Sequence, residues 1–321
     1  MKNRFCGGRA RFIVILALCF LDAASLLAEP PARLPAPALA YGSLYNHPTL
    51  PLPRDEPSFT STLVTLRSEG SPASVFGGRR EGSSSNEAWE DRALVLCWHT
   101  FIGKEGISTD FSLADFGAQL DAIRELGYRF PTVEELLAGR IEGSMNVVVT
   151  IDDGHRTVPL ALAKVLEPRG IVPTLFVYPS ILGTTDFGMN DRVLATLAAR
   201  GVPVGAHGYH HLFVTETLYK DDPKAFMDEI YKSKFKTEAL SGEFVLAYAY
   251  PYGALSARTK VEVKKAGFAA GFAVKPGFVY ASEALNDEYE LPRLVVTHDN
   301  WKDILALLSR NAAGAGEAGT R

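Results

Sequence analysis

The stretch VVVTIDDG, residues 147–154, joins an apolar, β-branched run to two adjacent carboxylates and a glycine. β-branched residues favour strands, and Asp-Asp-Gly is typical of the turn that ends one. Similar short apolar runs alternate with helical patterns from 93 to 310. This alternation predicts an α/β fold, a (β/α) barrel of about seven parallel strands that is distorted or incomplete. The predicted strands are 93–99, 146–151, 174–178, 202–206, 244–250, 271–274 and 294–297.

Helix start and stop signals lie between these strands. A Ser or Thr followed three residues later by an acidic residue can cap the first free amides of a helix, and a glycine after a helical run can close the last turn in a left-handed conformation. The helix starts are Ser112 with Asp115 and Thr132 with Glu135, and the closing glycines are Gly127, Gly170 and Gly201.

The first 28 residues have the layout of a secretory signal peptide. Four basic residues precede an apolar run, 12–27, that only Asp22 interrupts. The run is shorter and less purely apolar than the roughly 20 residues that a membrane span needs. We therefore expect cleavage near Ala28 and an exported protein without a stable membrane span, located in the periplasm, at the cell envelope or in the medium.

The rest of the chain divides by composition. Residues 29–92 are rich in Pro, Gly and Ser and have no sustained apolar period, which predicts a mostly disordered linker. Residues 93–310 carry the barrel pattern and form one large domain. The last segment, 311–321, is predicted to be a flexible tail.

Charge and cysteine content exclude some classes of protein. The chain of 321 residues has a formal net charge of −4. Loss of residues 1–28 removes four basic side chains and one acidic one and brings that charge to −7, so we expect no nucleic-acid partner. Cys97 is the only cysteine beyond residue 28, which excludes an intramolecular disulfide in the mature chain.

Two neighbouring carboxylates at the end of a barrel strand are placed where barrel enzymes do their chemistry. Asp152 and Asp153 could divide two tasks, one binding a cation and the other accepting a proton from water. Taken alone, the same residues are equally typical of a surface turn.

A second group of polar residues follows another short apolar strand. His207 and His211 are four residues apart, so on one helical turn both imidazoles would project from the same face and share one ion. With one Asp they would form the three-ligand pattern of a hydrolytic metal site. Zinc suits these ligands best, and cobalt, nickel and iron also fit them. The pair alone would also suit two structural histidines.

The order and spacing of these motifs resemble a known family. From about 93 to 310 the chain resembles the polysaccharide deacetylases of the NodB-homology type, carbohydrate esterase family four. Residues 150–154 are similar to their Thr-Phe-Asp-Asp-Gly motif, and 207–211 to their His-Ser/Thr-x-x-His motif. The stretch Tyr-Pro-Tyr-Gly, 250–253, is similar to the end of their Arg-x-Pro-Tyr motif.

The resemblance implies a role for each matched residue. Asp152 would be the general base, and Asp153, His207 and His211 would hold the metal. The backbone amide of Tyr252 would help hold the oxyanion. The aromatic residues of 247–253 themselves suggest either part of a substrate wall or an aromatic strand edge that ends in a turn.

This sequence departs from the family pattern at two positions. Gly208 stands where the family has Ser or Thr, so a hydrogen bond that braces the metal loop is missing or replaced. Ala249 stands where an Arg orients the catalytic base. Arg293 is the nearest downstream residue that could supply that charge.

Two histidines are candidates for the general acid. His298 lies where the family's closing Leu-x-His motif belongs, after the last predicted strand. His99, after the first strand, is the second candidate, because the poly-N-acetylglucosamine deacetylase branch has a similar Tyr-His there.

The resemblance predicts metal-dependent hydrolysis of N-acetyl groups from an amino sugar polymer, with release of acetate. The polymer could be poly-N-acetylglucosamine, peptidoglycan or a chitin-like chain. Two alternatives stay open: a non-catalytic carbohydrate-binding relative, and a small-molecule amidohydrolase. The sequence leaves the oligomeric state open.

Overall fold

The structure is a computed structural model that describes residues 91–104, 106–281 and 288–318. The predicted signal peptide (1–28) and nearly all of the predicted linker (29–92) lie outside these residues. None of the helices within the described ranges combines the length and the apolar character that a membrane crossing requires.

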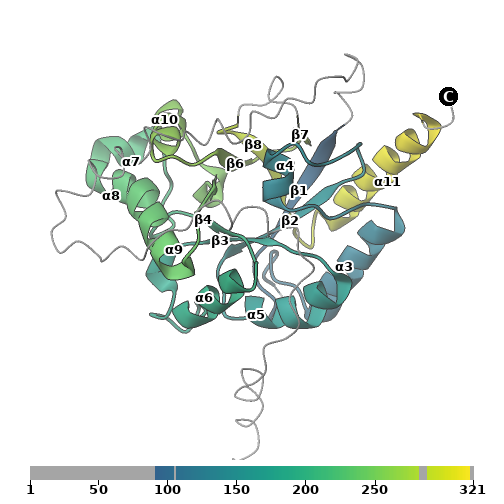
Figure 1. Ribbon diagram of the computed structural model, residues 1–321, viewed down its shortest axis with the longest axis horizontal. Helices are drawn as coiled ribbons and strands as arrows, with labels where there is room; N and C mark the ends of the chain where they lie inside the picture. Colours follow the sequence, from purple (N-terminus) through teal and green to yellow (C-terminus); the bar gives the residue numbers. More distant parts are fainter. Residues whose placement is uncertain (1–90, 105, 282–287, 319–321) are drawn as a thin grey trace, which may run out of the picture. The chain divides into compact units, whose positions relative to one another are not determined.

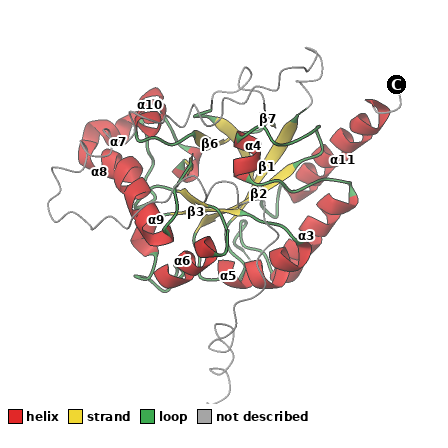
Figure 2. Cartoon of the chain, in the orientation of Figure 1, coloured by secondary structure: helices red, strands yellow, loops and turns green. Residues whose placement is uncertain are grey.

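Seven parallel strands form the centre of the domain: β1 (Arg92–Trp98), β2 (Val147–Asp153), β3 (Thr174–Val177), β4 (Val204–Ala206), β5 (Ala247–Ala249), β6 (Ala270–Val274) and β8 (Leu291–Val295). The sheet closes on itself because β1 pairs in parallel with both β2 and β8 (Figures 1 and 2). The prediction of an α/β barrel with about seven parallel strands is confirmed, and the ring is closed rather than incomplete.

The barrel is least regular between β6 and β8. A two-residue strand, β7 (Val279–Tyr280), pairs antiparallel with the start of β1, and the described residues between β6 and β8 include no helix. Strand β7 was not predicted, because two residues carry no detectable period.

The helices that connect the other strands are α3 (Leu113–Glu125), α4 (Val133–Leu137), α5 (Val158–Ala161), α6 (Asp191–Ala199), α7 (Glu216–Asp221), α8 (Pro223–Met227), α9 (Ser233–Ser241) and α10 (Ala257–Lys265). A last helix, α11 (Trp301–Ala318), follows β8. Shorter turns are the π-helical η4 (Leu162–Leu166) and η7 (Asp228–Lys232) and the 3₁₀ turns η5 (Glu167–Arg169), η6 (Pro179–Ile181) and η8 (Pro251–Gly253). Both predicted caps are present, and the three closing glycines have positive φ angles: Ser112 accepts from Asp115, Thr132 and Glu135 form a capping box, and Gly127, Gly170 and Gly201 end helical segments.

The C-terminal helix extends beyond the predicted end of the domain. We predicted a flexible tail from residue 311, but α11 continues to Ala318. Asn311 explains the continuation, because its side chain binds the hydroxyl of Tyr128 and the carbonyl of Ser144 and accepts from Arg92. These contacts tie the helix to the barrel past residue 310.

Alternation along the strands decides which side chains enter the barrel. In β2, Val147, Val149 and Ile151 pack outward against the helices, and Val148 faces the interior. The period of two therefore turns Thr150 and Asp152 inward as well.

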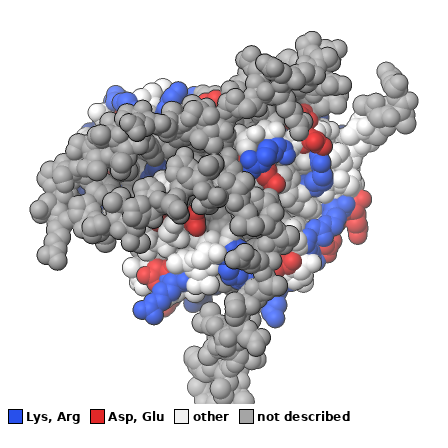
Figure 3. Space-filling model, viewed as in Figure 1, with Lys and Arg blue, Asp and Glu red and all other residues white. Residues whose placement is uncertain are grey.

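Surface charges are mixed. On the face drawn in Figure 3, basic and acidic side chains are interspersed. The surface ion pairs include that of Arg169 with Asp121, at 2.6 Å. Exposed pairs of this kind contribute about 0–1 kcal/mol each, so the buried core carries most of the stability.

Candidate metal centre and active site

Asp152 sits inside the barrel and is held by an arginine from another strand. Arg293 of β8 donates one hydrogen bond to each carboxylate oxygen, at 2.6 and 2.7 Å, and both side chains are almost fully buried. Burial raises the pKa of Asp152, but the charge and hydrogen bonds of Arg293 lower it more, so the pKa lies well below its usual range. Asp152 is therefore an ionised, oriented carboxylate.

Asp153 reaches the same site because the strand alternation breaks at this residue. A regular strand would turn the side chain after Asp152 to the opposite face. Asp153 instead has a φ of 71°, in the left-handed region that L residues rarely adopt. Its Oδ1 lies 3.8 Å from Nε2 of His207 and 3.5 Å from Nε2 of His211. The two adjacent carboxylates thus serve one site.

The two histidines present their Nε2 atoms to the same point. Nδ1 of His207 lies 2.8 Å from the carbonyl oxygen of Ala249, so Nδ1 carries the proton and Nε2 offers a lone pair. The Nε2 atoms of His207 and His211 are 3.1 Å apart. Burial lowers the pKa of each histidine to about 4, so both are neutral at physiological pH.

The donor set fits a divalent cation. One donor atom each from Asp153, His207 and His211 lies within 4.8 Å of the other two. Oδ1 of Asp153 is buried without a hydrogen-bond partner. Burial and the charge of Asp152 raise the pKa of Asp153 to about 7, because the charge of Arg293 offsets them only in part. Two imidazoles and one carboxylate leave a fourth position open, as in catalytic zinc sites.

Backbone strain concentrates at this site. Within the described ranges, the non-glycine residues with positive φ are Asp153, His211 and Tyr252. Such conformations cost on the order of 1–3 kcal/mol each and persist where the surrounding structure holds them, commonly at functional sites. The three residues converge here, since the ring of His211 contacts that of Tyr252 with centroids 4.4 Å apart.

The histidine loop, residues 207–212, differs from the prediction. We expected a helical turn to bring His207 and His211 together. The segment is irregular instead, with positive φ angles at Gly208 (77°) and His211. A bent loop therefore brings the two imidazoles together. The prediction that His207 and His211 share one face of a helical turn was wrong.

Aromatic side chains flank the donor set. Tyr252 and Phe213 stack with ring centroids 4.1 Å apart and an angle of 11°, and each is more than half exposed. Tyr178, directly after β3, packs its ring 5.0 Å from that of His211. Burial and the nearby Asp153 charge raise the pKa of Tyr178 to about 12, so it stays a neutral hydrogen-bond donor.

The structure separates the two general-acid candidates. Nε2 of His298 lies 2.8 Å from the backbone carbonyl of Asp110, and its ring packs on Phe111. These contacts hold His298 against the segment 108–111, and among the described residues it makes none with the carboxylates or histidines of the site. His99 lies beside Asp152, and its Nδ1 is buried without a hydrogen-bond partner.

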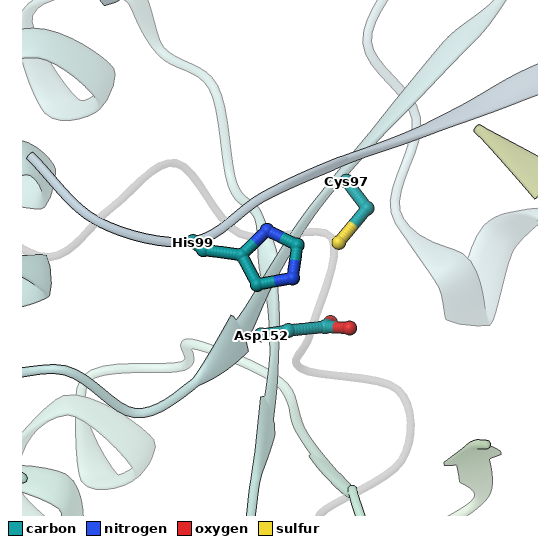
Figure 4. Close-up of side chains that lie close together, drawn as sticks. All are labelled: Cys97, His99 and Asp152. Carbon is teal, nitrogen blue, oxygen red and sulfur yellow. The ribbon is translucent and has the colours of Figure 1, made fainter. Parts of the chain in front are cut away.

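Cys97, His99 and Asp152 form a second group of donor atoms within 4.8 Å of one another (Figure 4). This group suits a cation poorly. Both oxygens of Asp152 already bind Arg293, whose charge would repel an ion. Burial raises the pKa of the Cys97 thiol well above its usual value, so it stays protonated. We therefore interpret His99 as a neighbour of Asp152 and not as a metal ligand.

Reasoning from the sequence missed three residues of this region. Tyr178 could have been found by the rule that functional side chains follow barrel strands. No sequence pattern marks Phe213, because its role depends on its stacking against Tyr252, which is distant in the sequence. Glu229, a buried carboxylate next to the histidine loop, lies within a helical stretch where charged residues are normally solvated.

Comparisons with known proteins agree with this geometry. Residues 141–271 match the family model of the polysaccharide deacetylases. This range contains the two carboxylates, both histidines and the Tyr-Pro-Tyr-Gly turn of the site. No curated protein matches the sequence.

Several solved structures share the fold. IcaB from Ammonifex degensii aligns with a TM-score of 0.60 and 26% identity over 68% of this chain and 97% of its own. The deacetylase PplD from Streptococcus pyogenes, in complex with acetate, aligns with a TM-score of 0.59 and 17% identity over 68% and 99%. A polysaccharide deacetylase from Bacillus cereus aligns with a TM-score of 0.57 and 21% identity over 68% and 70%. The resemblance expected from the sequence is confirmed over residues 141–271, which match the family model of the polysaccharide deacetylases.

Proposed function

We propose that this protein is a metal-dependent deacetylase that hydrolyses N-acetyl groups of an amino sugar polymer and releases acetate. One observation carries the proposal: the donor atoms of Asp153, His207 and His211 converge beside Asp152, which a buried arginine holds ionised. This arrangement pairs a three-ligand cation site with a fixed proton acceptor.

Asp153, His207 and His211 would hold the cation, for which zinc is the best match by ligand type. When bound, the cation supplies Lewis-acid activation of the acetamide carbonyl and of a water molecule. Asp152 accepts the proton of the attacking water. Arg293 keeps Asp152 ionised and fixes the orientation of its two oxygens.

The low pKa of Asp152 makes it a transient holder of that proton. Because Arg293 favours the ionised carboxylate, the proton passes on readily once the acetamide bond breaks. We assign His99 as the donor to the departing amine, because its imidazole lies beside Asp152 and its Nδ1 has no hydrogen-bond partner. His298 is bound to Asp110 and acts as a support for the neighbouring loop.

Tyr252 and Phe213 favour a polymer over a small amide. The backbone amide of Tyr252 would help hold the oxyanion, as the family resemblance implies. Its stacked ring and that of Phe213 present exposed apolar faces next to His211. Flat aromatic surfaces of this kind suit the apolar face of a sugar ring adjoining the acetylated one. Poly-N-acetylglucosamine is the first polymer to test, with peptidoglycan and chitin oligomers beside it.

The non-catalytic alternative loses its main support. It was suggested by Ala249, which lacks the arginine side chain that orients the base in the family. Arg293 occupies that role geometrically, with two hydrogen bonds to Asp152. A binding protein would not need a buried ion pair costly in desolvation at this position.

We also propose that the protein is exported, on the basis of the signal-like residues 1–28 and the location of cell-envelope polysaccharides. Detection of a mature form beginning near residue 29 in a periplasmic, envelope or culture fraction would support export. A cytoplasmic protein that retains Met1 would contradict it.

The proposed activity is tested by acetate release from N-acetylglucosamine oligomers. The purified protein is treated with a chelator and then supplied with zinc, cobalt or nickel. We expect release only with added metal, and its loss in Asp152→Asn and in His207→Ala. The His207→Ala variant should also lose metal binding, whereas Asp152→Asn should keep it. Metal binding without release from any of these polymers would refute the proposal.

A further inference from the structure

The shape of the histidine loop is not fixed by a helix or a strand. Residues 207–212 have no regular secondary structure, and Gly208 replaces the family's Ser or Thr. The separation of the two Nε2 atoms nevertheless determines whether His207 and His211 can share one cation. A group outside the loop must therefore hold it.

Glu229 provides such a group. Its carboxylate accepts hydrogen bonds from three backbone amides of the loop: Tyr209 at 3.1 Å, His210 at 2.6 Å and Leu212 at 3.1 Å. The side chain is fully buried. The ionised form accepts all three bonds, whereas a protonated carboxyl would direct a hydrogen at a donor.

The absence of a side chain at Gly208 leaves room for this carboxylate. A Cβ atom added at Gly208 would lie 2.3 Å from Oε2 of Glu229 and 3.0 Å from Cγ of Pro251. Its φ of 77° would also strain any side chain. In this chain the space beside the loop therefore holds the carboxylate of Glu229 in place of a side chain at 208.

A widened helical turn presents Glu229 to the loop. The residue lies in η7, the π-helical turn between α8 and α9. The hydroxyl of Tyr248 donates to the backbone carbonyl of Glu229 at 3.0 Å. Four residues along, the hydroxyl of Ser233 donates to the carbonyl of Gly208 at 2.7 Å. This helical segment thus binds three amides of the loop through Glu229 and one carbonyl through Ser233. π turns of this kind are frequent at functional sites.

We propose that Glu229 is a positioning residue that fixes the geometry of the two metal-binding histidines. Through the amides of residues 209, 210 and 212 it holds the backbone on both sides of His211, and so sets the distance of that imidazole from His207. This role rests on the proposed metal site. Glu229 is not one of the three donor residues, and its carboxylate accepts from backbone amides instead.

The proposal is tested by the zinc affinity of Glu229→Gln, measured by competition with a chromophoric chelator. Glutamine keeps the size of the side chain but replaces one acceptor oxygen by an NH₂ group that faces an amide donor. Groups that orient metal ligands contribute about 10- to 100-fold in affinity, so we expect the zinc Kd to rise at least tenfold. The absorption spectrum of the cobalt-loaded variant should change as well, because it reports ligand geometry.

Glu134→Gln is the matched control. Burial raises the pKa of Glu134, as it does that of Glu229, but Glu134 lies in α4, whose Val133 and Leu136 pack in the barrel-interior cluster. We expect this variant to bind zinc like the wild type. If Glu229→Gln does not fold, Ser233→Ala replaces it, with an expected loss of about threefold for one hydrogen bond to Gly208.

The outcomes distinguish a failure of the proposed function from a failure of the positioning role of Glu229. If the wild type binds no zinc, the proposed function itself fails. If the wild type binds zinc, and a folded Glu229→Gln or Ser233→Ala binds it equally with an unchanged cobalt spectrum, the positioning role is refuted and the metal site stands.

Discussion

Asp153→Asn should stabilise the metal-free protein, and more so as the pH rises. Burial, together with the charge of Asp152, raises the pKa of Asp153 from 3.8 to about 7. Between these two values the folded state retains a proton that the unfolded chain has already lost, so stability falls as the pH rises. One pKa unit corresponds to about 1.36 kcal/mol. From pH 5 to pH 8 this carboxyl therefore costs the folded state about 3 kcal/mol, a cost that asparagine does not have.

The measurement is urea unfolding of chelator-treated protein at pH 5 and pH 8. We expect the difference in unfolding free energy between Asp153→Asn and the wild type to grow by about 3 kcal/mol over this range. Other titrating groups cancel, because both proteins contain them. With saturating zinc the order should reverse, since the cation stabilises the folded wild type by mass action. A difference that is equal at the two pH values would refute the assignment of Asp153 as an uncompensated buried ligand.

Four further substitutions test the other roles. Arg293→Lys cannot form the two-pronged pair with Asp152, so acetate release should fall about 10- to 100-fold with KM nearly unchanged in steady-state kinetics; an unchanged kcat would contradict the orienting role. His99→Gln should lower kcat by about 10²- to 10⁴-fold, as expected for a proton donor, whereas His298→Gln should lower it less than tenfold; the opposite order would return the role to His298. Phe213→Ala removes a stacking contact that contributes about 0.5–1.5 kcal/mol, so KM for an N-acetylglucosamine pentamer should rise about two- to tenfold while KM for the monomer stays constant. Equal changes in the two KM values would exclude a contact with a neighbouring sugar.

Much of the fold follows from local sequence. The run VVVTIDDG predicts strand β2 and its turn, because β-branched residues and the closing Asp-Asp-Gly act within eight residues. Thr132 and Glu135 predict the start of α4, because their capping box spans three residues. The metal-ligand candidates could be named for the same reason, since each follows an apolar strand whose C-terminal end must reach one edge of the barrel.

The rest depends on contacts between distant segments. His99 and His298 both follow strands, and only the bond of His298 to Asp110 distinguishes them. The histidine loop bends through left-handed residues that a spacing of four cannot reveal. Glu229 reads as one more charged residue of an amphipathic helix until the three amides that face it are placed.

The position of the orienting arginine shows why a missing motif residue is weak evidence for lost activity. β5 and β8 belong to the same closed ring, so Ala249 and Arg293 both face the interior that holds Asp152. Ala249 is fully buried, and Ala249→Arg alone would overfill this interior and set a second cation against Arg293. We expect that variant to be less stable and less active.

Combining Ala249→Arg with Arg293→Ala restores both volume and charge. We expect the double variant to recover part of the activity that Arg293→Ala loses, which a double-mutant cycle on kcat would measure as a strongly non-additive effect. A double variant no more active than Arg293→Ala would mean that Asp152 requires its arginine from β8 and not merely a guanidinium within the barrel. Recovery would mean that the base needs two donors at its oxygens, and that the ring offers more than one strand from which to supply them.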